Sequence, residues 1–365
     1  MAINAIGNGI PFPKGIGIPH SIKNNMVLWY DIKRQGATNE TMKANPILKD
    51  LSGNGHDATC YNFAWSGMSG IGGYPTNSSN VNIQSNRAEW INSYTLKVTN
   101  AVNGNLVLNS ITIKGEQGQP LLISTKEVHI RVSGLTEEQS IIINHGLNNG
   151  NSTKWITDVT VSTNGEYTIP SLNEVIKPYD ANSTPNCTNN RFAVFGAGTI
   201  NNIIIEFLPE YPNALVADGV DDYVRVDGTP ILTDYTVIAK RKILSELDDT
   251  YKTFAAKGVT PYQGVFILER QRDNGKTYEI FNFGEFNLIT EIPTDITYMT
   301  SNSYNGNPIA KGNAIDEDAV HIFARYNQNQ HISAVLYSFI LFNRTLTTKE
   351  INWVKENLIE GDTEL

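Results

Sequence analysis

A succession of short strand-like runs, separated by turn residues, most constrains what this chain can fold into. Runs such as SYTLKVTN, EVHIRVSG, EYTIPS and NNIIIEFLP recur between residues 87 and 209, with Gly, Asn or Pro between them. Longer runs such as YTVIAKRKIL and HISAVLYSFILFN follow in residues 210–365. β-Branched and aromatic residues suit pleated strands, and Gly, Asn and Pro suit the turns between them. The chain is therefore predicted to be all-β and built of sandwiches.

Composition agrees with this prediction and excludes several classes of partner. The chain has 365 residues, of which 40% are hydrophobic and 18% charged, so packed cores covered by neutral polar residues are expected. The formal net charge is -9, and the densest basic stretch, residues 240–242 (KRK), is interpreted as a solvated strand end. We therefore expect no nucleic-acid partner.

Membrane insertion and ordinary secretion are also not expected from the sequence. No run of about 18 apolar residues exists, so no transmembrane segment is predicted. The first residues, MAINAIGNGIPFPKGIGIPHS, lack a basic region followed by an uninterrupted apolar region, so no signal peptide is predicted either.

Residues 1–25 are rich in Gly, Pro and Ile, and they are predicted to form an extended N-terminal arm. Pro11, Pro13 and Pro19 oppose a long helix. The arm is too apolar for a solvated tail, so we expect it to dock on the domain or on a partner. Its apolar residues are Ile3, Ile6, Ile10, Phe12, Ile16 and Ile18.

One short helix is predicted near the C-terminus, in the segment TLTTKEINWVKENLIE. Thr347 and Glu350 have the spacing of a capping box, in which each side chain bonds the backbone amide of the other residue. Ile351, Val354 and Leu358 then fall on one face of the helix.

Three stretches resemble laminin-G-like, concanavalin A-like jelly-roll domains. They are LWYD at 28–31 with DLSGNGHDA at 50–58, ADGVDDYV at 217–224, and LYSFILFNRTLT at 336–347 with Glu350 and Ile351. Ala58 replaces a frequent glycine of the family, and Ala217 replaces its usual aromatic residue.

The resemblance implies a jelly roll that is interrupted by a second domain. In that family the first two motifs lie close in sequence, whereas here a strand-rich block separates them. We therefore predict a jelly roll formed by residues 26–75 and 211–365, with a smaller β-sandwich inserted at 76–210. Strands near Trp29 and near Tyr337 are predicted to share one core.

The arrangement is also similar to virion or tail components of Bacteroides-type phages and prophages. This resemblance implies a virion or cell-surface location and other assembly proteins as partners through the N-terminal arm. A homo-oligomer is also expected, and the lectin-like domain is expected to attach to a surface or a glycan.

No catalytic residues are predicted. Retaining glycosidases of this fold carry carboxylates that alternate along one strand, and the only match is EGDTE at 360–364, at the end of the chain. The consecutive acids at 316–318 would point to opposite faces of a strand. We therefore predict a non-enzymatic attachment protein. The alternative is a carbohydrate-binding module or glycan-processing enzyme of a gut bacterium.

Trp65 and Tyr74 are the candidate glycan-binding residues. They flank a glycine-rich loop, and aromatic faces stack on the apolar face of a pyranose. For each ring, packing in the core or at its edge is the alternative.

Asp218, Asp221 and Asp222 are the candidate metal ligands, because carboxylate oxygens suit calcium. No other cofactor is expected. The same side chains also suit a structural turn in which they accept hydrogen bonds from nearby backbone amides, and this second interpretation is favoured.

Overall fold

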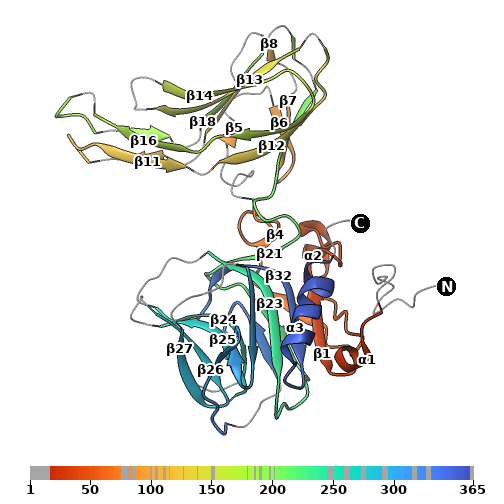
Figure 1. Cartoon of the computed structure of the whole chain (residues 1–365). Helices are drawn as coiled ribbons and strands as arrows, with labels where there is room; N and C mark the ends of the chain where they lie inside the picture. The colour runs from red at the N-terminus through yellow and green to blue at the C-terminus, as the bar shows by residue number, and fades with distance from the viewer. Residues whose placement is uncertain are drawn as a thin grey trace. The chain divides into compact units, whose positions relative to one another are not determined.

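The computed structural model of this chain is built mostly of antiparallel β-strands, as predicted (Figure 1). The chain divides into two compact units: residues 1–73 with 211–365 form unit 1, and residues 74–210 form unit 2. The structure describes residues 17–361 apart from the following gaps: 75–81, 84–87, 99–100, 103–105, 110–111, 115, 126, 138, 149–152, 179, 185, 189–190, 197–198, 201, 245–249, 259–263, 273–276, 290–294, 315–318 and 326–329.

The described residues of unit 1 form a sandwich of two eight-stranded sheets. In sheet 1 the strands lie in the order β30-β29-β28-β23-β32-β21-β4, and β1 also pairs with β32. Their bounds are β1 (Met26–Asp31), β4 (Gly70–Ile71), β21 (Leu215–Asp218), β23 (Thr236–Ile243), β28 (Ile296–Thr300), β29 (Ser303–Tyr304), β30 (Asn307–Pro308) and β32 (Ser333–Phe342).

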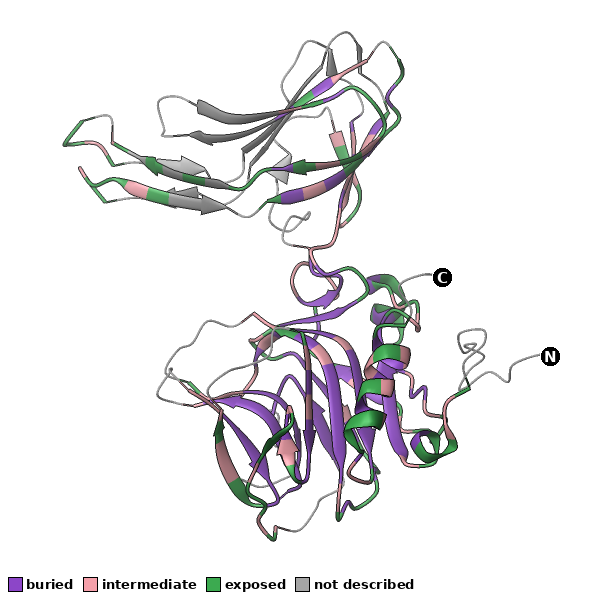
Figure 2. Ribbon diagram, viewed as in Figure 1, coloured by how far each residue is buried: buried purple, intermediate pink, exposed green. Residues whose placement is uncertain are grey.

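Sheet 2 has the order β2-β3-β22-β31-β24-β25-β26-β27. One core cluster, including Leu28, Phe254 and Leu336, fills the space between the two sheets, and Figure 2 shows their strands largely buried. Burial of this apolar surface is the main stabilising contribution. The bounds in sheet 2 are β2 (Ile47–Leu48), β3 (Ala58–Tyr61), β22 (Tyr223–Val226), β24 (Lys252–Lys257), β25 (Phe266–Gln271), β26 (Tyr278–Asn282), β27 (Glu285–Ile289) and β31 (Val320–Ile322).

The ten-residue strand β32 joins the parts of the chain that lie before and after unit 2. One edge of β32 pairs with β23 along most of its length. The other edge is shared end to end, because residues 333–336 pair with β21 and residues 338–342 pair with β1. Trp29 lies opposite Ile340, so the prediction that these distant strands share one fold is confirmed.

The chain segments that leave and re-enter unit 1 are joined to each other by hydrogen bonds. The backbone amide of Tyr211 donates to the carbonyl of Gly72 at 2.8 Å, and the amide of Gly72 donates to the carbonyl of Ala214 at 2.8 Å. Because the two ends of the break are hydrogen-bonded to each other, the residues between them need not contribute to the fold of unit 1.

The C-terminal helix covers part of the outer face of sheet 1, the face turned away from sheet 2 (Figure 1). Helix α3 (Thr348–Val354) continues into a π-helical turn, η2 (Lys355–Ile359). The predicted capping box is confirmed, with Thr347 as N-cap and Glu350 bonding back to it. The predicted face is also confirmed, since Ile351, Val354 and Leu358 are buried against a cluster that includes Trp29, Ile238 and Ile340.

The described end of the predicted arm is not extended throughout. Residues 20–23 form helix α1 (His20–Lys23), whose Ile22 is buried in the cluster beneath the C-terminal helix. Ile18 packs against the same cluster. The arm residues Ile3, Ile6, Ile10, Phe12 and Ile16 lie outside the described residues. A further helix is α2 (Asn39–Ala44), and no helix in the described parts of the chain is long and apolar enough to cross a membrane.

The interpretation of residues 240–242 as a solvated strand end is wrong for Arg241. Alternation along β23 turns this residue into the space between the sheets, where its side chain is 1% exposed. Its Nε donates to Glu269 Oε2 at 2.8 Å, and the hydroxyl of Tyr304 donates to Glu269 Oε1 at 2.6 Å. A buried charge requires such a partner, and the sequence alone does not show that Glu269 supplies it.

Within its described residues, unit 2 contains two five-stranded sheets, β15-β12-β20-β7-β6 and β14-β13-β18-β9-β5, and three two-stranded ones. Its core lies between the larger sheets and includes Leu96, Ile130, Ile143 and Val161. The strands are β5 (Asn82–Ile83), β6 (Ala88–Asn92), β7 (Thr95–Val98), β8 (Ala101–Val102), β9 (Leu106–Asn109), β10 (Thr112–Lys114), β11 (Leu121–Thr125), β12 (Val128–Ser133), β13 (Ile141–Asn148), β14 (Thr153–Val161), β15 (Gly165–Ile169), β16 (Leu172–Ile176), β17 (Asn186–Thr188), β18 (Arg191–Gly196), β19 (Thr199–Ile200) and β20 (Ile203–Phe207).

Thr347→Ala is expected to lower the free energy of unfolding by about 1 kcal/mol, because it removes the N-cap of α3. Urea denaturation measures the change. The matched control is Thr348→Ala, at the next position, where an exposed threonine is replaced without loss of the cap. Equal destabilisation by the two variants would contradict a role for the cap.

His321 is expected to make unit 1 less stable at mildly acidic pH. This residue is 4% exposed, and no hydrogen-bond partner of its Nδ1 is found in the described part of the chain. Burial, with the nearby charge of Arg225, lowers the pKa of His321 to about 4. In the unfolded chain His321 therefore becomes protonated near pH 6.5, whereas in the folded chain it stays neutral until the pH is close to 4. The free energy of unfolding therefore falls as the pH drops from 6.5 towards 4.

Between pH 7 and pH 5, the shifted pKa of His321 accounts for a loss of up to about 2 kcal/mol in the free energy of unfolding. The replacement His321→Leu should remove this loss. Urea denaturation at the two pH values gives the measurement. A variant whose stability changes with pH as much as the wild type would show that His321 is not the buried group responsible.

Candidate functional site

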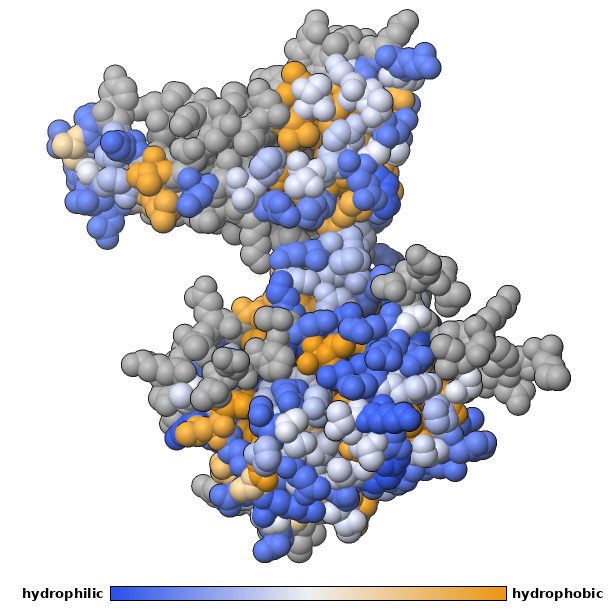
Figure 3. Space-filling view, viewed as in Figure 1, coloured by the Kyte–Doolittle hydropathy of each residue, from blue (hydrophilic) through white to orange (hydrophobic). Residues whose placement is uncertain are grey.

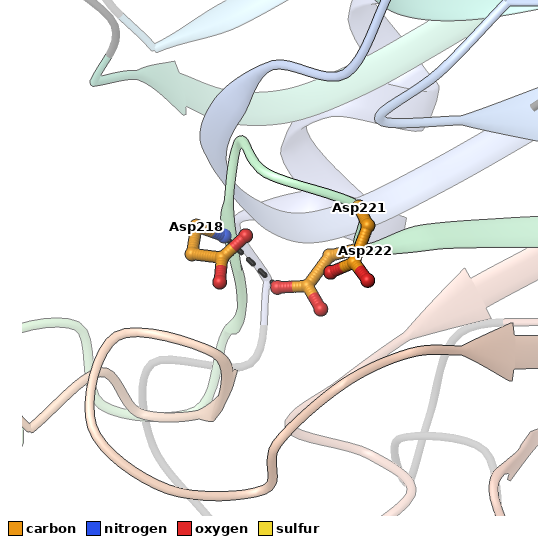
Figure 4. A group of neighbouring side chains, drawn as sticks. All are labelled: Asp218, Asp221 and Asp222. Atoms are coloured by element: carbon orange, nitrogen blue, oxygen red, sulfur yellow. Dashed lines mark hydrogen bonds between the residues drawn. The ribbon is translucent and has the colours of Figure 1, made fainter. Parts of the chain in front are cut away.

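The three predicted metal ligands lie on one turn, residues 218–222, named here the acidic turn. It connects β21 to β22, and Gly219 gives it a left-handed residue with φ +84°. Asp218 Oδ1 accepts from the amide of Val220 at 2.8 Å, and Asp222 Oδ2 accepts from the amide of Asp218 at 2.9 Å (Figure 4). These bonds are the structural role expected of Asp side chains in turns.

The same turn has a geometry that fits a calcium ion. One ligand atom from each of Asp218, Asp221 and Asp222 lies within 4.8 Å of the others. Calcium binds oxygen at 2.3–2.6 Å, so ligands on opposite sides of one ion are about this far apart. Asp218 and Asp221 are exposed and Asp222 is buried. Within the described residues no hydrogen bond is made to the carboxylate of Asp221, so this carboxylate is the one most open to a cation.

Burial gives Asp222 an unusual charge state. It raises the pKa of this carboxyl to about 7, and the nearby charges of Asp218 and Asp221 contribute to the rise. Hydrogen bonds from the amide of Asp218 and the hydroxyl of Ser69 oppose it. Near neutral pH the Asp222 carboxyl is therefore close to half protonated, and a bound cation would favour its ionised form.

Trp65 lies on a loop that is hydrogen-bonded to the acidic turn. Within residues 62–73, named here the Trp65 loop, the hydroxyl of Ser69 donates to Asp222 Oδ1 at 3.0 Å and accepts from the amide of Ala64 at 2.8 Å. The side chain of Asn62 also donates to the carbonyl of Asp221 at 3.0 Å. The loop and the turn together are called the joined-loop site.

The Trp65 loop holds its tryptophan in an uncommon conformation. Trp65 has φ +53°, and its half-buried ring stacks on Phe63 with 5.1 Å between the centroids. Asn39 anchors the other end, since its Oδ1 accepts from the amide of Ile71 at 2.7 Å and its Nδ2 donates to the carbonyl of Ile71 at 3.0 Å. A large non-glycine residue kept at positive φ requires such a well-bonded surrounding.

Tyr74 belongs to unit 2, where its ring stacks on Tyr94 at 4.1 Å between centroids. Trp65 belongs to unit 1, as the candidate metal ligands do.

Residues that the sequence did not single out complete the joined-loop site. Ser69 is buried and carries the bond between the loop and the turn. Tyr61 and Tyr223 stack at 4.7 Å beside it, on β3 and β22, and the carbonyl of Asp222 lies 3.2 Å from His331 Nδ1. The pairing of β3 with β22 places Tyr61 opposite Tyr223, and the motif at 217–224 does not indicate this long-range partner.

Comparisons with known proteins give no family for this chain. No family model and no curated protein sequence matches it. The solved structures that it is similar to include a Trypanosoma rangeli sialidase in complex with 2,3-difluoro-KDN, with 15% identity over 40% of this chain and 27% of that chain, and a TM-score of 0.30. The chain thus spans about a quarter of that sialidase.

Two further matches are similarly distant. A truncated AlyQ with CBM32 and alginate lyase domains is 10% identical over 79% of this chain and 99% of that chain, with a TM-score of 0.26. An F-lectin from striped bass (Morone saxatilis) serum is 10% identical over 69% of this chain and 86% of that chain, with a TM-score of 0.20. Likenesses of this size identify neither a substrate nor an activity.

Asp222 is expected to lower the stability of the metal-free protein as the pH rises from about 4 to about 7. In this range the unfolded carboxyl is already ionised while the folded one keeps its proton, so folding becomes less favourable. Asp222→Asn should remove this decline, as measured by urea denaturation in EDTA. Asp295→Asn, which replaces an exposed carboxylate outside the acidic turn, is the control. An unchanged pH dependence in Asp222→Asn would contradict the raised pKa.

Proposed function

We propose that the chain is a non-catalytic attachment protein that binds a glycan at the joined-loop site of unit 1, with calcium held by the acidic turn. The observation that carries the proposal is the hydrogen bond from Ser69 to Asp222, because it joins the loop of Trp65 to the candidate metal ligands. Such a site has two components. One is an aromatic ring on which a sugar can stack, and the other is a set of oxygen ligands for a cation that also binds sugar hydroxyls.

The charges of the acidic turn support a binding role over a structural role alone. Asp218 and Asp222 accept hydrogen bonds from backbone amides, and these two residues would be sufficient for a turn that needs only local hydrogen bonds. The third carboxylate, Asp221, adds repulsion and raises the pKa of Asp222. A cation would reverse the sign of this contribution, because it would be attracted by all three groups.

A glycan-processing enzyme is the rival function, and the raised pKa of Asp222 is the observation that favours it. A glycosidase acid needs such a pKa, and its partner carboxylate lies about 5 Å away in retaining enzymes. However, Asp222 is fully buried and both its oxygens accept hydrogen bonds from the protein. An acid so enclosed is poorly placed to protonate a glycosidic oxygen, so we favour binding.

A phage virion appendage is the biological setting that we propose for this binding, with the N-terminal arm contacting other assembly proteins. Mass spectrometry of purified particles tests it. Detection of the chain as a stoichiometric particle component is the expected result, and its absence from particles of a strain that carries the gene would remove the virion setting.

A glycan array probed with the full chain, in calcium and then in EDTA, tests the binding function. We expect binding to at least one glycan in calcium and a loss of about tenfold or more in EDTA, as for a site that uses the metal. Trp65→Asn should have a similar effect, because asparagine tolerates positive φ and the variant removes only the ring.

Two further variants identify the cause of any loss. Asp221→Asn should weaken calcium binding, measured by calorimetry, while it spares the hydrogen bonds that form the turn. Trp353→Gln, which removes another half-buried tryptophan of unit 1, should bind glycan as the wild type does. Absence of binding to every glycan in calcium would contradict the proposal, and release of sugar products from a bound glycan would favour the enzyme.

A further inference from the structure

A strip of side chains on the outer face of sheet 2 begins next to the acidic turn. It runs along β22 and the neighbouring strand β3, on the face turned away from sheet 1. Val224 and Val226 of β22 point into the core between the sheets, so the alternate residues of this strand lie on the outer face. Directly opposed residues of two paired strands share a face. The residues of this tyrosine strip are two opposed pairs, Tyr61 with Tyr223 and Thr59 with Arg225.

Tyr61 presents an aromatic ring at the surface in a fixed orientation. Its ring centroid lies 4.7 Å from that of Tyr223, with 8° between the two ring planes. Tyr223 is 5% exposed, whereas Tyr61 is 37% exposed. Because Tyr223 covers one face of the Tyr61 ring, the exposed area lies on the other face and on the edges. A ring that is already held in place loses little entropy when a ligand stacks on it.

The hydroxyl groups of the two stacked rings are open to a ligand. In the described part of the chain neither hydroxyl makes a hydrogen bond, and neither is among the buried polar atoms that lack a partner. The hydroxyl of Tyr223 therefore reaches solvent, although the rest of this side chain is buried. A phenol both donates and accepts, as the hydroxyl groups of a sugar do.

The charges at the far end of the strip are paired with each other. Arg225 Nε donates to Asp227 Oδ1 at 2.8 Å, and a second guanidinium nitrogen lies 2.7 Å from the same oxygen. Arg225 is half-buried and Asp227 is exposed. The pair offers hydrogen-bond donors and acceptors at the surface but no net charge, which favours a neutral, hydroxyl-rich ligand over a charged one.

The tyrosine strip is continuous with the joined-loop site. Asp222 precedes Tyr223 in the chain, and the side chain of Asn62, the residue after Tyr61, donates to the carbonyl of Asp221 at 3.0 Å. Consecutive Cα atoms and directly opposed Cα atoms have known spacings, so the Cα atoms of Tyr61 and Asp222 lie within about 9 Å of each other. Two linked sugar rings are comparable in length with this separation.

We propose that the joined-loop site binds a neutral glycan chain through at least two sugar units, one at the acidic turn and the next stacked on Tyr61. This inference rests on the proposed function and specifies its ligand as a chain, not as a single terminal sugar. The apolar face of the second sugar stacks on the Tyr61 ring, and its hydroxyl groups bond to the phenols and to the Arg225–Asp227 pair.

The position of the strip in sheet 2 opposes a peptide ligand. An extended peptide binds by adding a strand to a free sheet edge. In sheet 2 both β3 and β22 are inner strands, with β2 on one side of them and β31 on the other. A ligand of the tyrosine strip therefore has to be recognised through side chains, as a sugar is.

A glycan array of length-matched sugars, probed with the full chain in calcium, tests the inference. It carries neutral glucose, galactose and mannose series, each as mono-, di- and trisaccharides in α and β linkage. We expect the wild type to bind the disaccharide of at least one series about tenfold more tightly than the monosaccharide, because the second ring adds a stacking contact.

Variants of Tyr61 locate the second sugar unit. Tyr61→Thr removes the ring but keeps a residue suited to a strand, so the ratio of disaccharide to monosaccharide affinity should fall to nearly one. Tyr61→Phe keeps the ring and should keep most of the preference. Leu288→Thr is the matched control, because it replaces another exposed apolar residue on the opposite edge strand of sheet 2. Thermal unfolding checks that every variant folds.

Three results would overturn the inference. Equal binding of mono- and disaccharides by the wild type would do so and leave the proposed function in place. A Tyr61→Thr variant that unfolds at a lower temperature but keeps the preference would show that the stack only stabilises the sheet. The third result is no binding to any neutral series, and binding of other glycans on a wider array would then show that the proposed function survives.

Discussion

The pairing of β32 with both β1 and β21 is the interaction on which the rest of unit 1 depends. It is made between residues that are far apart in the chain, so ordering it carries a large cost in loop entropy. Burial of both faces of sheet 1 offsets this cost. One face packs in the core between the sheets, and the other packs against the C-terminal helix. The junction of the two pairings coincides with a bulge in β32 at Tyr337.

The joined-loop site has the same origin. The Trp65 loop belongs to the part of the chain before unit 2, and the acidic turn belongs to the part after it. Ser69 and Asn62 bond to the turn only because β3 pairs with β22 and β4 pairs with β21. Polar residues cover most of the face of unit 1 that Figure 3 shows, with apolar residues in small separate groups, so this face has no broad apolar surface.

The sequence predicted the elements with strong local signals. Thr347 and Glu350 specify their capping box because both groups lie in one helical turn, and the run MVLWYD specifies a strand through its own residues. The family-like motifs around Trp29 and Tyr337 correctly indicated a shared fold. Long-range partners were not predictable in this way. The pairing of Arg241 with Glu269 depends on register across two sheets, and the bulge at Tyr337 depends on a one-residue shift that alternation in the sequence does not display.

The central claim is that the chain segments on either side of residues 74–210 form one self-sufficient fold, and a deletion tests it most directly. Replacing residues 74–210 with a short glycine linker joins Gly73 to Tyr211, next to the existing hydrogen bond between Gly72 and Tyr211. Urea denaturation, followed by tryptophan fluorescence and circular dichroism, then measures folding. We predict one cooperative transition, coincident for both probes. A deleted chain that stays unfolded, or whose two probes give separate transitions, would contradict the account.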